Sequence, residues 1–214
     1  HFTRVDSDVI DRLIVKEDQK SEELADTKRE ILSTVFSGQL PKVQKTEFHV
    51  ETQAMGETAA PIVITQAEYM RRMKEMANIQ PGMSFYGEMP SMFNLVLNSD
   101  HRLIKQVLED AESACSEKLV PVESEIAMLK LRENELHKAH EGKKDEEIPT
   151  TEKDELHDVE KKLDEQKKQK TDIINEYAAG NKVVHQLIDL ALLQNNMLKG
   201  EALTNFVKRS IELI

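Results

Sequence analysis

Apolar residues crowd the carboxyl-terminal end of the chain. Between Asn181 and Gln194 they point in almost every direction around one expected helix, and Asn195–Asn196 and Lys199–Gly200 then mark helix ends. A second helix follows, with one apolar face made of Leu203, Phe206, Val207, Ile211 and Ile214. A helix that is apolar all round must be covered on all sides, and each fully buried Leu, Ile or Val contributes roughly 1.5–3 kcal/mol.

These tail helices therefore predict a partner surface. Because only a short tail is available to cover them, we infer that a second copy of the chain does so, giving a four-helix bundle from two helix pairs. The alternative is that both helices fold back onto their own domain. The residues expected to line the dimer interface are Val183, Val184, Leu187, Ile188, Leu190, Ala191, Leu193, Leu203, Phe206, Val207 and Ile211.

The first half of the chain mixes helix and strand patterns. Ser21 to Leu40 has the period of an amphipathic helix that ends at Gly38 and Pro41. Residues 47–55 alternate apolar and polar positions and residues 61–65 are rich in β-branched side chains, so we expect a β-hairpin.

The segment after that hairpin predicts a helix, a strand and a second helix. Thr65 and Glu68 have the spacing of a capping box, which opens a helix from Gln66 to Asn78. Residues 93–98 predict a third strand, and Asp100 is the expected cap of a helix that begins near His101.

A heptad-like repeat runs from about Glu109 to Glu176. It breaks in the first arm at Glu133, crosses a polar tip with Gly142 and Pro149, and passes through Gln166 and Lys170 in the second arm. This pattern predicts an antiparallel coiled-coil hairpin, whose arms of some twenty residues would project about 30 Å. The apolar repeat positions are Leu119, Val122, Ile126, Leu129, Leu136, Leu156, Val159, Leu163 and Ile173, with Tyr177 at the end.

Together these elements predict an α+β fold in four parts. Residues 1–17 would be the edge of a preceding domain, 18–108 an α+β core, 109–176 the inserted hairpin and 177–214 the dimerization helices. The chain begins at a histidine, so we expect it to be a fragment or a processed form of a longer protein.

Composition limits the classes of binding partner and the cellular compartment that we expect. The net charge of −11 over 214 residues argues against general affinity for nucleic acid or acidic membranes. One cysteine, Cys115, excludes an intrachain disulfide and favours a reducing compartment. No apolar run approaches the length of a membrane span. We therefore expect a cytoplasmic protein.

No residue pattern predicts catalysis or a cofactor. The acidic neighbours of Cys115 would raise its pKa, the opposite of what a nucleophile needs. Gly82 and Gly87 have phosphate-loop spacing, but Glu88 stands where that motif requires lysine. His137 and His140, three residues apart with Glu141 adjacent, lack a placed third ligand. We expect no catalytic, cofactor or metal site in this chain.

Methionines cluster between residues 55 and 92. Such flexible, polarizable side chains adapt to varied apolar surfaces, which suits the binding of unfolded proteins. The alternative is that the expected helix at Gln66–Asn78 packs its methionines against the sheet. The candidate residues for client binding are Tyr69, Met70, Met73, Met76, Met83, Phe85 and Tyr86.

Three segments carry a family resemblance: EYMRRMKEM at residues 68–76, FNLVLNSDH at 93–101, and the tail from Val183 to Ile214. From roughly Asp18 onward, the chain resembles the carboxyl-terminal domain of the bacterial ninety-kilodalton heat-shock chaperones. The hairpin departs from the shortest members of that family.

The resemblance implies a specific role. The tail helices would be the family's dimerization element, and the helix with Met70, Met73 and Met76 would contact client proteins. ATP and magnesium would bind elsewhere in the longer protein, and residues 1–17 would belong to its middle domain. A coiled-coil adaptor that uses the hairpin to bind its partner is the alternative, and a free-standing enzyme is a third possibility.

Overall fold

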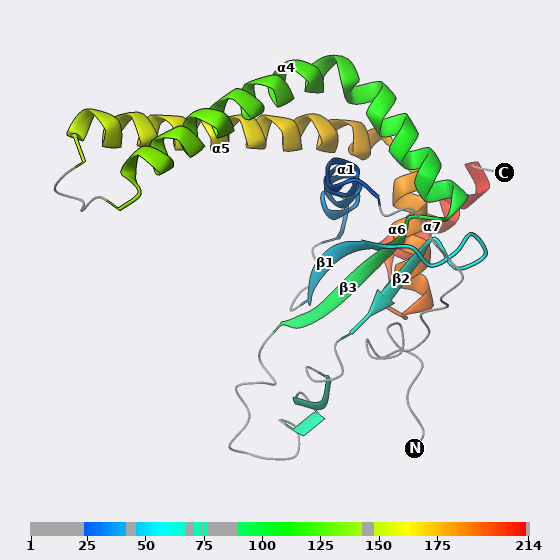
Figure 1. Cartoon of the computed structure of the whole chain (residues 1–214). Coiled ribbons are helices and arrows are strands. Elements are labelled where there is room, and N and C mark those ends of the chain that lie inside the picture. The colour runs from blue at the N-terminus through cyan, green and yellow to red at the C-terminus, as the bar shows by residue number, and fades with distance from the viewer. Residues whose placement is uncertain are drawn as a thin grey trace. The chain divides into compact units, whose positions relative to one another are not determined.

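The computed structural model of the chain describes residues 24–41, 46–66, 71–73, 75–76, 90–142 and 148–212 (Figure 1). It combines helices with a small three-stranded sheet, which confirms the predicted α+β class. In chain order the elements are α1 (Asp26–Ser37), β1 (Thr46–Gln53), β2 (Ile62–Thr65), β3 (Ser91–Asn98), α4 (Arg102–His140), α5 (Thr150–Gly180), α6 (Lys182–Gln194) and α7 (Glu201–Glu212).

Some predictions lie outside the described residues. These include the proposed middle-domain edge at 1–17, Glu68 of the expected capping box and most of the tip of the hairpin. Of the helix expected at Gln66–Asn78, residues 66, 71–73 and 75–76 are described. Residues 71–73 and 75–76 are helical, but Gln66 forms a β-bridge and Thr65 ends β2, so the predicted start at Gln66 with Thr65 as its cap is wrong.

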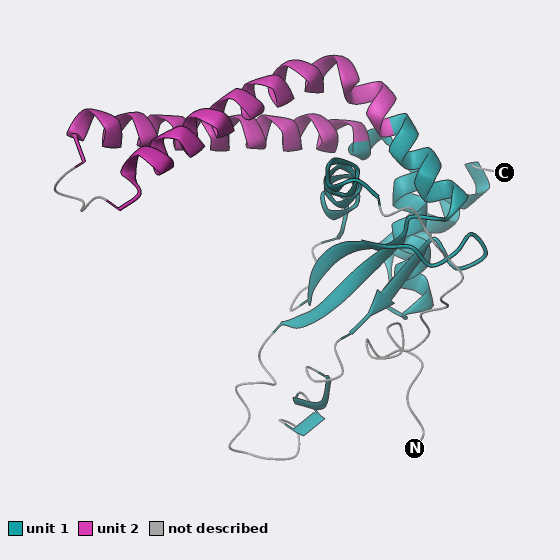
Figure 2. Cartoon of the chain, viewed as in Figure 1, with its two compact units in different colours: residues 1–110, 178–214 teal, residues 111–177 magenta. Residues whose placement is uncertain are grey.

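The chain divides into two compact units (Figure 2). Unit 1 joins residues 1–110 to residues 178–214, so the tail helices belong with the sheet although they are far from it in sequence. Unit 2 is residues 111–177, a helical hairpin.

The sheet of unit 1 has the strand order β1-β3-β2. β3 pairs in parallel with β1, with Phe48 opposite Phe93, and antiparallel with β2, with Ile62 opposite Leu97. The predicted hairpin of β1 and β2 is therefore wrong. Alternation and turn composition identify two strands, but they do not reveal that the more apolar β3 comes between them.

One buried side chain fastens the loop between β1 and β2. The Asn98 side chain, with no measurable exposure, accepts from the Met55 amide at 3.1 Å and donates to the Gly56 and Ala60 carbonyls at 2.8 and 3.3 Å. Asp100 accepts from the Gly56 amide at 2.9 Å. The loop that passes across the end of β3 is thereby held by β3 itself.

The predicted role of Asp100 as a helix cap is wrong. Its carboxylate bonds to the amide of Gly56, while the ring nitrogen Nδ1 of His101 accepts from the Leu103 amide at 3.1 Å. α4 begins at Arg102, so His101 caps the first turn.

Helices cover one face of the sheet. α1 packs against β1, α6 packs against β2, and the two helices also contact each other, so they form one layer. β1 shows the corresponding alternation, with Phe48, Val50 and Thr52 half-buried and the intervening residues exposed. The core of this layer includes Leu32, Val35, Phe36, Ile62, Leu95, Leu97, Val184 and Ile188, all almost fully buried.

Unit 2 places the predicted heptad positions along one seam. Leu119, Val122, Ile126, Leu136, Val159 and Leu163 are buried, and Leu129 and Ile173 are packed against them. Lys170, at a seam position, is itself buried and pairs with Glu123 at 3.1 Å. The heptad pattern thus predicted the faces of α4 and α5 that pack together.

Candidate functional site: the exposed apolar face of the tail helices

α6 starts at a well-formed cap. The Asn181 side chain accepts hydrogen bonds from the amides of Val183 and Val184 at 2.9 and 3.1 Å, which satisfies two of the free donors of the first turn. The helix ends at Gln194, and Asn196 (φ 56°) and Gly200 (φ 60°) then take the left-handed conformation that reverses the chain into α7.

Much of the apolar surface of α6 is covered inside the chain. Val184, Leu187, Ile188 and Ala191 are all buried, along with Leu192, which was not among the predicted interface residues. These four side chains are therefore covered by their own chain, and the prediction that a second copy covers them is wrong. Period alone shows that a helix is apolar all round, but it cannot distinguish the directions that its own sheet occupies.

Polar contacts hold α7 against α6. Arg209 pairs with Asp189, Lys182 with Glu212 at 2.8 Å, and the Gln186 amide donates to the Ser210 hydroxyl at 2.6 Å. These contacts lie on one side of α7 and fix which face it turns outward.

The outward side of this helix pair is apolar. We define the tail patch as the five exposed apolar residues Leu190 (39%), Leu193 (36%), Leu203 (37%), Val207 (49%) and Ile211 (70%). In α7, Leu203, Val207 and Ile211 follow at intervals of four and therefore share one face. No residue of α7 is buried within the described part of the chain, so its apolar face lacks cover there. Val183 and Phe206, also predicted for the interface, are half-buried beside it.

Burial and ion pairing shift the pKa values of two carboxyl groups in the α6–α7 helix pair, Asp189 and Glu212. Burial raises the pKa of Asp189 above its usual value, and the neighbouring Arg209 opposes that rise. The hydrogen bond from Lys182 lowers the pKa of Glu212. Polar side chains of α7 contact α6, and none of the apolar side chains of α7 is buried. The tail patch is therefore left exposed to solvent.

The methionine cluster is described only in part. Met73 is half-buried and Met76 is 41% exposed, whereas Tyr69, Met70, Met83, Phe85 and Tyr86 lie outside the described residues. Met92, which the sequence analysis did not single out as a client residue, is 49% exposed in β3. Its alternation with half-buried Phe93 is the signal that could have identified it.

The cysteine and the two histidines that were considered as reactive or metal-binding groups lie in unit 2. Burial, more than the acidic neighbours expected from sequence, raises the pKa of the Cys115 thiol. His140 pairs with Glu152 at 3.1 Å rather than acting with His137. His137 instead lies close to Glu133 and Glu160, a combination the sequence could not show because Glu160 comes from the other arm. Along the described residues, no helix is both long and apolar enough to cross a membrane.

Comparison with known proteins agrees with the residue patterns. Over 213 residues the chain is 67% identical to the chaperone protein HtpG of Bacteroides fragilis, a match that covers all of this chain and 31% of that protein. The corresponding values are 64% identity for HtpG of Bacteroides thetaiotaomicron and 45%, over 217 residues, for that of Porphyromonas gingivalis, each with 31% of the relative covered. No family model matches the chain, and no solved structure does.

Identity this high along the entire chain shows homology to a segment of a molecular chaperone of the heat-shock class. The segment is the carboxyl-terminal portion of HtpG, as the resemblance indicated, and the chain spans 31% of the length of the curated relatives it matches.

Proposed function

We propose that this chain joins two copies of an HtpG-type chaperone through the tail patch. The observation that carries the proposal is the apolar face of α7, which continues onto Leu190 and Leu193 of α6 and has no cover in the described chain. A second copy suits this surface, because two-fold pairing places the same patch on both sides. Two α6–α7 pairs would then form the four-helix bundle expected from the sequence.

A stable dimer interface at this end of the chain would serve a chaperone in a specific way. Tethering two long chains at one end keeps their distant parts at high effective concentration, so they can meet and separate repeatedly. The nucleotide and magnesium site that drives this cycle would lie in the rest of the longer protein, which we expect to work in the cytoplasm. In this proposal the present chain contributes assembly and binding rather than catalysis.

We also propose that the methionine cluster contacts client proteins. Exposed Met76 and Met92 support an adaptable apolar surface in unit 1. Clients would be unfolded or partly folded proteins, because these expose apolar segments without a fixed shape. In the full-length protein, replacing Met70, Met73 and Met76 by serine should weaken suppression of client aggregation. Unchanged suppression would contradict a client role for these residues.

Sedimentation equilibrium tests whether the chain dimerizes through the tail patch. The chain should be a dimer at micromolar concentration, and Val207→Asp with Ile211→Asp should give monomers, because each charge would be buried without a partner in the bundle. Both residues are exposed in the single chain, so the double variant should keep its helical content by circular dichroism. Leu187→Asp is a poorer test, since Leu187 is buried in its own unit.

Met128→Asp is the matched control. Met128 is an apolar residue of unit 2 that is as exposed as those of α7, and its replacement should leave the dimer intact. A monomeric wild-type chain, or a double variant that dimerizes with unchanged affinity, would reject the proposed interface.

A further inference from the structure

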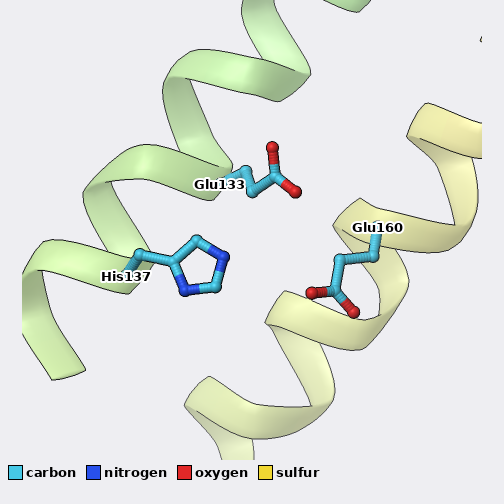
Figure 3. Close-up of side chains that lie close together, drawn as sticks. All are labelled: Glu133, His137 and Glu160. Atoms are coloured by element: carbon cyan, nitrogen blue, oxygen red, sulfur yellow. The ribbon is translucent and has the colours of Figure 1, made fainter.

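Three side chains with metal-binding atoms meet across the coiled-coil hairpin. Glu133 and His137 come from α4, four residues apart and so on one face of that helix, and Glu160 comes from α5 (Figure 3). One ligand atom of each lies within 4.8 Å of the others. Figure 3 shows the three side chains directed into the space between the two arms.

Among the described residues, neither carboxylate of this cluster forms an ion pair within 4.0 Å. The nearby cation Arg132 is already engaged, with Glu135 at 3.0 Å and Glu155 at 2.7 Å. His140 faces Glu152. Two negative charges are thus held beside an imidazole, an arrangement that favours a bound cation.

Position in the heptad adds a second argument. Glu133 occupies a seam position, where the repeat otherwise places apolar residues, and it is half-buried. The other seam residue with a charge that the sequence analysis singled out, Lys170, has a partner in Glu123. Glu133 has no counterpart of that kind among the described residues, so its carboxylate is left facing His137 and Glu160.

We propose that Glu133, His137 and Glu160 bind a divalent transition-metal ion of the Zn²⁺ type. One imidazole nitrogen with two carboxylate oxygens suits such an ion, whereas Ca²⁺ and Mg²⁺ prefer oxygen ligands alone. Tetrahedral bonds of about 2.1 Å place ligand atoms roughly 3.4 Å apart, so ligand atoms that now lie within 4.8 Å of one another must approach by at most about 1.4 Å. His137 and Glu160 are exposed, which leaves them free to rotate, and water would complete the coordination.

The ion would cross-link the two arms of the hairpin. Two of its ligands belong to α4 and the third to α5. An ion that binds only when the two helices are packed together stabilises the packed state relative to the separated one. The site lies wholly within unit 2 and is independent of the tail patch.

Equilibrium dialysis of the full 214-residue chain against Zn²⁺ tests the site. The wild type should bind one Zn²⁺ that His137→Gln and Glu160→Gln each weaken by at least about tenfold, because loss of a direct ligand should cost no less than loss of an outer-shell partner. Zn²⁺ should also raise the thermal midpoint of the wild type, whereas Mg²⁺ should not.

Matched controls are available on the same hairpin. His157→Gln and Glu165→Gln remove an exposed imidazole and an exposed carboxylate of α5 outside the cluster, and both should bind Zn²⁺ as the wild type does. The site is rejected if the wild type binds no Zn²⁺ at about 100 μM, a concentration well above the dissociation constants typical of protein zinc sites. It is equally rejected if His137→Gln retains wild-type affinity.

Discussion

Asn98 uses both ends of its carboxamide to connect segments that are distant in sequence. The oxygen accepts from Met55 and from Asp100, each at 3.1 Å, while the nitrogen donates to two carbonyls of the loop before β2. The side chain is fully buried, so all four bonds are made inside the protein. A single residue at the end of β3 therefore determines the path of the loop.

Replacing this residue should destabilise unit 1 strongly. Asn98→Ala removes four hydrogen bonds to backbone groups, one of them buried and three part-buried, and we expect the free energy of unfolding to fall by about 2–4 kcal/mol. Chemical denaturation measures the change. Gln53→Ala, an exposed position at the end of β1, is the control and should change stability by less than about 0.5 kcal/mol. Equal effects of the two substitutions would contradict the role assigned to Asn98.

At the scale of elements, the sequence predicts periods better than pairings. The alternation of β1, the seam of α4 and α5 and the ends of α6 all follow from local side-chain spacing, and the structure has each of them. The insertion of β3 between β1 and β2 depends on contacts between segments some forty residues apart, which no local pattern encodes. For the same reason, the joining of Glu160 to His137 could not be predicted.

The seam of the hairpin contains a buried lysine, whose desolvation costs free energy. Lys170 is buried where the heptad repeat favours an apolar residue, and its pairing with Glu123 compensates for the lost hydration of its ammonium group. Such pairs rarely stabilise more than an apolar side chain of similar size.

Completing the apolar seam should therefore preserve or raise stability. Lys170→Leu leaves Glu123 unpaired, but that side chain is 42% exposed and stays hydrated, so its charge is not stranded in the interior. We therefore expect a free energy of unfolding equal to that of the wild type or up to about 2 kcal/mol higher, measured by thermal or chemical denaturation. Lys168→Leu, at an exposed position of the same helix, should have little effect. A loss of more than about 1 kcal/mol in Lys170→Leu would show that the ion pair contributes net stability.

Across the whole molecule, the tail helices show what composition can and cannot predict. Their residue pattern correctly predicts two helices, and the helix ends fall where Asn and Gly residues indicate. How the cover is divided between the protein's own sheet and any second copy depends on tertiary packing. That division reduces the predicted interface from eleven side chains to the tail patch and its half-buried neighbours Val183 and Phe206.

Unit 1 should fold and self-associate without the hairpin. The bases of the two arms lie side by side, since Lys118 pairs with Glu176 at 3.0 Å, so a short glycine–serine linker can replace residues 111–177. We expect this variant to retain its sheet by circular dichroism and its dimer by sedimentation. Loss of a specific binding partner with the dimer intact would favour the adaptor alternative. A monomeric or unfolded product would show that unit 1 depends on the hairpin.

The separation of unit 1 into two stretches of sequence also affects its synthesis on the ribosome. β2 is complete at Thr65, but α6, which covers it, begins at Lys182, after the entire hairpin has been made. At about 5–20 residues per second, Ile62 and Ile64 wait roughly 6–25 s for that cover. Each newly made copy therefore spends seconds with the apolar side chains of β2 uncovered, as in the partly folded proteins to which chaperones bind.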